Sequence, residues 1–321
     1  MLSQEILIPL LIVYGVMFGL LNLAGVLIWV ERRALALWQD RLGPNRLGPL
    51  GIFQLVADII KIFTKEDWIP PFADRVVFVI APTIVFIAVL LTAALIPFGE
   101  NIVVFDPNIG VLCFLAFSSM GIYSVVLGGW SSANKFSLLG GIRASSQMFS
   151  YEVFMGLSLM GVVILSESFS LVAIVEAQRD MWFIIPQFFG FLPFLFAGMA
   201  ESHRMPFDAP EAESEIIAGF HSEYSGMKFG MFFVGEYVGV AVISALVTTF
   251  FFGGWLGPDF LPGPVWFFLK TFVFILFFIL ARASIPRPRY DQLFAFGWKV
   301  ILPLTLLNLI VTGAVVLALE G

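Results

Sequence analysis

The sequence predicts an all-α integral membrane protein: a bundle of about eight transmembrane helices, an amphipathic interfacial helix and structured cytoplasmic loops. Its 321 residues are 60% hydrophobic and only 12% charged, with a mean hydropathy of +0.97. Soluble domains are closer to half apolar and a quarter charged, so this composition excludes a water-soluble globular protein. The apolar stretches are continuous rather than alternating, which favours helices over the strands of a membrane barrel.

Several stretches are long enough to cross a bilayer, because a spanning helix needs about 20 apolar residues for a ~30 Å hydrocarbon core. They form a single membrane domain over residues 1–321, without a long soluble domain or a large repeat. The amino terminus lacks the basic region of a secretory signal, so its apolar run is expected to remain as a helix. The expected spans are approximately 6–30, 76–98, 109–130, 146–166, 184–202, 230–253, 264–283 and 296–318.

The basic residues lie almost entirely in alternate loops and at the helix ends beside them. Of the 17 lysines and arginines, all except Arg179 and Lys270 fall between spans 1 and 2, 3 and 4, 5 and 6, or 7 and 8. Lys and Arg accumulate in the cytoplasmic loops of membrane proteins. We therefore expect these loops to be cytoplasmic, both termini to be periplasmic, and the membrane to be the cell inner membrane.

The first cytoplasmic loop is expected to contain an amphipathic helix over residues 51–65. Gln54, Asp58, Lys61 and Lys65 recur at helical spacing and form one narrow polar stripe on an otherwise apolar helix. The segment is too short to span comfortably. Two interpretations are open: the stripe faces water on a helix at the membrane surface, or it lines an internal cavity.

An acidic cytoplasmic loop is expected at residues 203–229, between two spans that carry a glutamate at membrane depth. The carboxylates of the loop and of spans 4 to 6 are Glu152, Glu201, Asp208, Glu211, Glu213, Glu215, Glu223 and Glu236. Carboxylates at membrane depth are costly, rare and usually functional. Capping is a structural alternative for Asp208 and Glu211, which have the spacing of a capping box. Glutamates near the cytoplasmic ends of three consecutive spans, beside an acidic loop, favour a buried polar path.

No metal site or redox cofactor is expected in this chain. The single cysteine, Cys113, lies in an apolar run, and no Cys/His cluster has iron–sulfur, zinc or haem spacing. His203 and His221 lack partners at metal-ligand spacing. If electrons are involved, their carriers belong to other subunits.

Four long motifs resemble the H-subunit family of bacterial proton-pumping NADH:quinone oxidoreductase, respiratory complex I, whose mitochondrial counterpart is NADH dehydrogenase subunit 1. The likeness covers nearly the whole chain. The motifs are ERRALALWQDRLGPNRLGPLGIFQLVADIIKIFTKEDWIP, GWSSANKFSLLGGIRASSQMFSYEV, AESHRMPFDAPEAESEIIAGFHSEYSGMKFGMFFVGEY and RPRYDQLFAFGWKVILPLTL.

The resemblance implies a membrane-arm subunit that forms much of the quinone-binding chamber and couples quinone reduction to proton translocation. It implies quinone, expected to be ubiquinone, as substrate, with FMN and iron–sulfur clusters held by partner subunits. The partners would be peripheral quinone-site subunits, adjacent membrane subunits and lipid, and no nucleic acid. The quinone-side candidates it implies are Glu31, Arg32, Arg41, Asp58, Arg282 and Arg287. The proton-path candidates are the eight carboxylates named above, of which Glu201 varies within the family.

Two other functions stay open. A membrane subunit of an energy-converting hydrogenase shares the ancestry but uses no quinone; the EAESE loop together with the RPRYDQ segment favours the quinone enzyme. A stand-alone ion transporter would have substrate groups and broken helices near mid-membrane, whereas the charges here are crowded at one interface.

The charge distribution makes a topological prediction. Reporters fused after residue 70 or residue 215 should read cytoplasmic, and reporters at residue 104 or residue 259 should read external. A clear reversal at any one position would contradict the eight-span topology.

Overall fold

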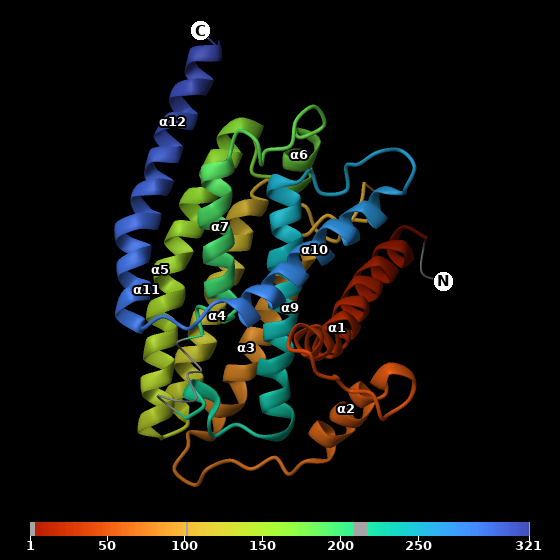
Figure 1. Ribbon diagram of the computed structural model, residues 1–321, viewed down its shortest axis with the longest axis vertical. Helices are drawn as coiled ribbons and strands as arrows, with labels where there is room; N and C mark the ends of the chain where they lie inside the picture. Colours follow the sequence, from red (N-terminus) through yellow and green to blue (C-terminus); the bar gives the residue numbers. More distant parts are fainter. Residues whose placement is uncertain (1–3, 101, 209–216, 321) are drawn as a thin grey trace.

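The computed structural model is a bundle of helices and describes residues 4–100, 102–208 and 217–320 (Figure 1). No β-strand forms among these described residues. The helices in chain order are α1 Gln4–Trp38, η1 Pro49–Gly51, α2 Gln54–Thr64, α3 Arg75–Ala94, α4 Gly110–Ser131, α5 Lys135–Ser166, α6 Leu171–Glu176, α7 Phe188–Glu201, η2 Gly219–His221, α9 Gly226–Phe251, α10 Gly263–Ser284, α11 Tyr290–Phe296, the π-helical turn η3 Gly297–Ile301 and α12 Leu302–Glu320.

Seven helical segments of the described chain are long and apolar enough to cross a membrane, which confirms the all-α membrane class. Helix α9 lies in the middle of the bundle and contacts α1, α3, α7 and α10 (Figure 1). Inside the bundle, 72% of the apolar stretch of α9 is buried, against 17% to 56% for the other six. The side chains of α9 therefore form the centre of the interior, and any polar group on it is enclosed by protein.

The fifth expected span is shorter than predicted. The sequence predicts a span over 184–202, but α7 has only 14 residues, Phe188–Glu201. At 1.5 Å per residue it is about 21 Å long, less than the ~30 Å core. Pro186 disfavours helical geometry at the residue before it. A hydrogen bond to α12 stabilises the turn before α7: Gln187 Nε2 donates to Thr312 Oγ1 at 2.8 Å.

Helix α5 begins earlier than predicted. The expected span began at 146, after a loop, but the helix starts at Lys135, where the Asn134 side chain accepts a hydrogen bond from the Phe136 amide at 2.9 Å. Gly140 does not break the helix; it allows the backbone of Gly219 to approach so closely that a Cβ would lie 2.7 Å from it. The added turns place Glu152 in the middle of α5, rather than near its end.

Two other boundaries also differ from the sequence prediction. Helix α1 continues past residue 30 to Trp38, so Glu31 and Arg32 lie on its last turns. The segment after α10 is non-helical over 285–289, but its remainder forms α11, which runs into α12 through one π-helical turn.

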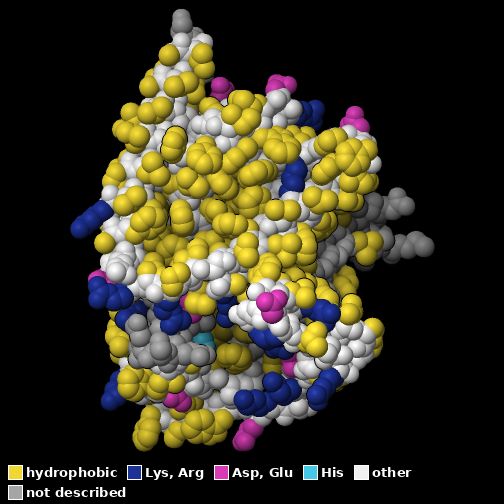
Figure 2. All heavy atoms as spheres, in the orientation of Figure 1, with side chains coloured by type: hydrophobic (Ala, Val, Ile, Leu, Met, Phe, Trp, Pro, Cys, Tyr) yellow, Lys and Arg dark blue, Asp and Glu magenta, His cyan; other side chains and the backbone are white. Residues whose placement is uncertain are grey.

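Charged side chains are segregated on the surface. Figure 2 shows hydrophobic side chains covering most of the upper part of the molecule, whereas Lys and Arg gather in the lower part. The lower part contains the connections from α1 to α3 and from α10 to α11 (Figure 1). The candidate site lies inside the bundle at this charged end.

Candidate functional site

Arg204 is the centre of a buried charge cluster. It follows α7 and is only 5% exposed. Its Nη1 lies 2.9 Å from Glu31 Oε2 on α1, and its Nε lies 3.0 Å from Glu236 Oε1 on α9. The guanidinium also stacks over the Tyr237 ring, 4.4 Å from its centroid. The Arg204 side chain therefore links the C-terminal end of α7 to α1 and α9.

Two more arginines complete the cluster. Arg282 Nη1 on α10 donates to Glu31 Oε1, and Arg287 Nη2 lies 2.5 Å from Asp208 Oδ2. The three carboxylates of Glu31, Glu236 and Asp208 thus face three guanidinium groups. A buried charge is tolerated when an opposite charge pairs with it, and this balance of charges meets that condition. Not every polar atom is satisfied: Arg204 Nε, Asp208 Oδ1 and Arg287 Nε have no hydrogen-bond partner among the described residues.

The protonation of the cluster follows from its surroundings. Burial by itself lowers the pKa of Arg204, but the carboxylates of Glu236 and Glu31 raise it above its ordinary value, so the cation persists. Burial raises the pKa of Asp208, although the hydrogen bond and the charge of Arg287 oppose the shift. Asp208 is therefore easier to protonate than an exposed aspartate.

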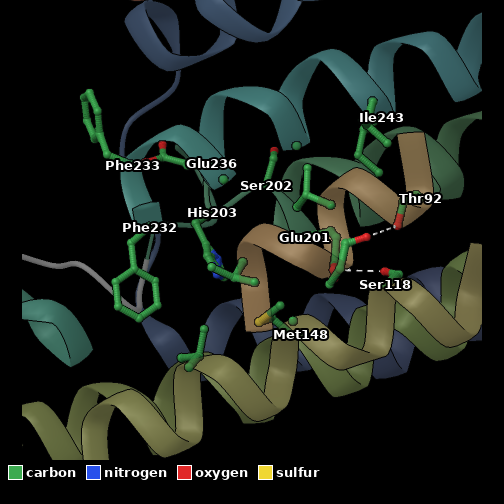
Figure 3. A pocket seen from close by; sticks show the side chains of 18 of the residues that line it. Thr92, Ser118, Met148, Glu201, Ser202, His203, Phe232, Phe233, Glu236 and Ile243 are labelled. Carbon is green, nitrogen blue, oxygen red and sulfur yellow. Dashed lines mark hydrogen bonds between the residues drawn. The ribbon is translucent and has the colours of Figure 1, made fainter. Parts of the chain in front are cut away.

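A cavity of about 290 Å³ adjoins the cluster (Figure 3). It lies among α3, α4, α7 and α9, and aromatic side chains such as Phe114, Phe117 and Phe232 form much of its wall. Its charged or titratable lining residues are Glu201, His203, His221, Glu236 and Arg282. Because Glu236 and Arg282 also belong to the charge cluster, the cavity and the cluster are continuous.

Glu201 differs from the carboxylates of the cluster because no cation neutralises it. Ser118 Oγ on α4 donates to Glu201 Oε1 at 2.9 Å (Figure 3). Among the described residues, no Lys or Arg forms an ion pair with Glu201. Glu152 on α5 is close enough to repel it electrostatically. The cavity thus has a balanced set of charges on one side and Glu201, without a described cationic partner, on the other.

The amphipathic helix turns part of its polar stripe toward the protein. Asp58 Oδ2 lies 2.6 Å from Arg32 Nη1 on α1, and Gln54 Nε2 donates to Asp58 Oδ1 at 3.0 Å. Apolar residues of α2, including Ile60 and Phe63, are exposed instead. Gln54 and Asp58 therefore face α1, but neither lines the cavity described above, so the choice between the two interpretations of the stripe stays open. The ion pair is partly exposed, so it orients the two side chains more than it stabilises the fold.

Comparison with known proteins identifies the family. Residues 10–313 match the family model described as NADH dehydrogenase. The chain belongs to the NADH dehydrogenase family. Within this family it is 63% identical over 304 residues to the H subunit of NADH-quinone oxidoreductase from Methylococcus capsulatus, covering 95% of this chain and 96% of the relative.

The structure brings together most, but not all, of the residues that the family resemblance suggested. Arg41 is exposed, and its Nε donates to Gln39 Oε1 at 2.9 Å, not to the cluster. Glu223 accepts a hydrogen bond from Asn134 Nδ2 at 2.6 Å. Residues Glu211, Glu213 and Glu215 lie outside the described part of the chain. The candidates fall into three groups: the pair of Arg32 and Asp58, the cluster of Glu31, Asp208, Glu236, Arg282 and Arg287, and Glu201 with the nearby Glu152.

Sequence reasoning missed Arg204 as a site residue, although it is the centre of the cluster. In the sequence it stands only among the basic residues that set the topology. A single arginine placed between Glu201 and a run of carboxylates is the signal that could have revealed it. Ser118 carries no such signal, because serine is common in apolar helices.

The geometry predicts that Arg204→Met strongly destabilises the chain. The change leaves Glu31 and Glu236 buried with one cation fewer, and removing one partner of a buried pair costs roughly 3–5 kcal/mol. The loss of stability is measured by thermal denaturation of the purified complex, in which the unfolding of this chain is monitored. Arg179→Met is the matched control, because Arg179 forms an exposed pair with Glu176 at 3.7 Å that should contribute under about 1 kcal/mol. Equal stability of both variants would contradict the assignment.

Proposed function

We propose that this chain is a membrane subunit of an NADH:quinone oxidoreductase that helps to bind the quinone headgroup and couples its reduction to proton movement. One observation carries the proposal: charged groups follow one another from the surface to the interior. The Arg32–Asp58 pair is partly exposed at α1 and α2, and Glu31, the neighbour of Arg32 in the chain, belongs to the buried Arg204 cluster. The cavity beside that cluster is lined by Glu201, which Glu152 repels electrostatically. The 63% identity to the H subunit of a quinone oxidoreductase supports it.

The α1–α2 end of this succession suits a quinone headgroup. The arginines there can donate hydrogen bonds to the quinone oxygens, and the apolar exposed face of α2 suits the membrane-soluble part of the molecule. Reduction needs two electrons and two protons. We propose that partner subunits deliver the electrons from FMN and iron–sulfur clusters, and that this chain responds to the charge that develops.

The carboxylates respond electrostatically. A unit charge about 10 Å away contributes roughly 1.7 kcal/mol at an effective dielectric constant of 20. That exceeds the ~1.4 kcal/mol that changes a protonation equilibrium tenfold. Charge developing beside Arg282 and Glu31 can therefore shift protons on carboxylates beyond the cavity. Because Glu152 is close enough to Glu201 to interact with it electrostatically, a change of charge on one affects the other.

We further propose that the chain resides in the cell inner membrane with both termini periplasmic. The basic residues at one end of the bundle support this orientation.

If the α1–α2 end binds the quinone, Asp58→Asn should lower NADH:quinone activity selectively. Without the carboxylate, Arg32 loses its orienting partner, so NADH:quinone activity of the assembled enzyme should fall roughly tenfold, equivalent to about 1.4 kcal/mol. Electron transfer from NADH to an artificial acceptor at the flavin should persist. Asp106→Asn is the matched control: Asp106 accepts from Ser170 far along the chain from α2, and its replacement should be silent. Parallel loss of both activities in Asp58→Asn would refute the local role.

If Glu152 and Glu201 take part in proton movement, Glu152→Gln should lower quinone reduction and proton pumping together, while the complex assembles normally. Gln keeps the size and the hydrogen-bonding capacity of Glu but cannot ionise. Turnover and proton uptake in sealed vesicles measure the effect. Glu176→Gln on α6, whose carboxylate is half exposed, is the control and should behave as the parent. Full coupled activity of Glu152→Gln would rule out the relay.

A further inference from the structure

Lys228 lies in the first turn of α9 and is almost enclosed by protein, with 10% of its side chain exposed. Its Nζ lies 2.5 Å from Asp67 Oδ2, in the connection from α2 to α3, and 5.8 Å from the centroid of the Phe78 ring on α3. In the described ranges no other carboxylate pairs with it. A buried ammonium without a counter-ion is unfavourable, so this ion pair restricts where the connection after α2 can lie.

The backbone around this ion pair brings α2 and the connection that follows it against α9 (Figure 1). Ser225, just before α9, donates from its Oγ to the Glu66 carbonyl at 3.2 Å. Further along α9, a Cβ built on Gly230 would lie only 3.0 Å from Ile62 Cγ2 on α2. The end of α2 is therefore held at α9 by one ion pair, one hydrogen bond and one close packing contact.

Three ionic links join α1, α2 and α9 in a closed ring. They are Arg32–Asp58 between α1 and α2, Asp67–Lys228 between the connection after α2 and α9, and Glu236–Arg204–Glu31 between α9 and α1. The three helices also contact one another directly. Two of the links hold α2, one near its middle and one just after its end. If the second link is removed, α2 can pivot about the first.

We propose that Lys228 and Asp67 are positioning residues for the quinone: their ion pair holds α2 against α9 and thereby sets the opening between α1 and α2. This inference rests on the proposed function, which places the quinone headgroup at that opening. Lys228 and Asp67 do not touch the quinone themselves. Loss of their ion pair leaves the arginines and carboxylates of the site in place but lets α2 move. The result is weaker quinone binding with little change in the later steps.

Lys228→Met tests the proposal most cleanly, because it leaves behind a carboxylate that is 47% exposed and that water can solvate. Asp67→Asn would instead leave a buried ammonium unpaired. In the assembled enzyme we expect Lys228→Met to raise the KM for quinone about tenfold with kcat nearly unchanged. Lys228→Arg keeps the charge and should stay near the parental KM.

Lys135→Met is the matched control, because Lys135 also lies in the first turn of a helix but is exposed and forms no ion pair among the described residues. Its KM for quinone should be parental. NADH oxidation by an artificial acceptor at the flavin should be unchanged in all three variants, since the flavin belongs to a partner subunit under the proposed function.

Cross-linking measures the placement of α2 without quinone. In a Cys113→Ser background, Ile62→Cys and Gly230→Cys place two Cβ atoms within about 4.5 Å, a separation that a disulfide can bridge. Mild oxidation of the purified complex should form this cross-link several-fold more slowly when Lys228→Met is added, as followed by peptide mass. Once formed, the cross-link should restore the parental KM, because it holds α2 where the ion pair did.

The outcomes are distinct from those that test the proposed function. A parental KM in Lys228→Met, an equal rise in Lys228→Arg, or a raised KM that the cross-link does not restore would overturn the positioning role. An unchanged rate of cross-linking would overturn it as well. If Asp58→Asn keeps full NADH:quinone activity, the quinone site at α1 and α2 itself fails. Impaired Asp58→Asn with fully parental Lys228→Met would reject only the role of the Lys228–Asp67 pair.

Discussion

The double ion pair of Arg204 is the interaction on which the site depends. A guanidinium inside an apolar bundle is stable only if carboxylates compensate it, since desolvation costs several kcal/mol per ion. Glu31 and Glu236 supply that compensation from α1 and α9 at 2.9 and 3.0 Å. Rotation or sliding of either helix would leave buried charge unpaired, so the cluster constrains the relative placement of the helices that surround the cavity.

The contrast between the two sides of the cavity gives the site its chemistry. On one side three carboxylates face three arginines, so the charges there are balanced. On the other side Glu201 has a serine hydroxyl and the nearby Glu152, but no described cation. A carboxyl in that setting responds strongly to charge that develops elsewhere, because no local counter-ion masks the change.

The amphipathic helix α2 packs against α1 and α9 with its apolar side chains facing outward. Its polar residues Gln54 and Asp58 turn toward α1, and its apolar residues are exposed. Exposed apolar surface of this kind is stable against lipid or a partner protein rather than water. Under the proposed function, the quinone headgroup would approach the polar face between α1 and α2, and its apolar tail would contact the exposed apolar face of α2.

The sequence by itself determined the membrane class and most of the spans, because hydrophobicity is a property of each local stretch. It also named the carboxylates, which stay candidates. It did not determine that α7 has only 14 residues, where Gln187 contacts α12, or that α5 continues without a break through Gly140, where the backbone of Gly219 approaches closely. The sequence also could not show that Arg204 pairs with Glu31 and Glu236, or that Arg41 lies away from this cluster. Which charges meet depends on how distant helices are rotated against one another, and only packing of the whole bundle sets those rotations.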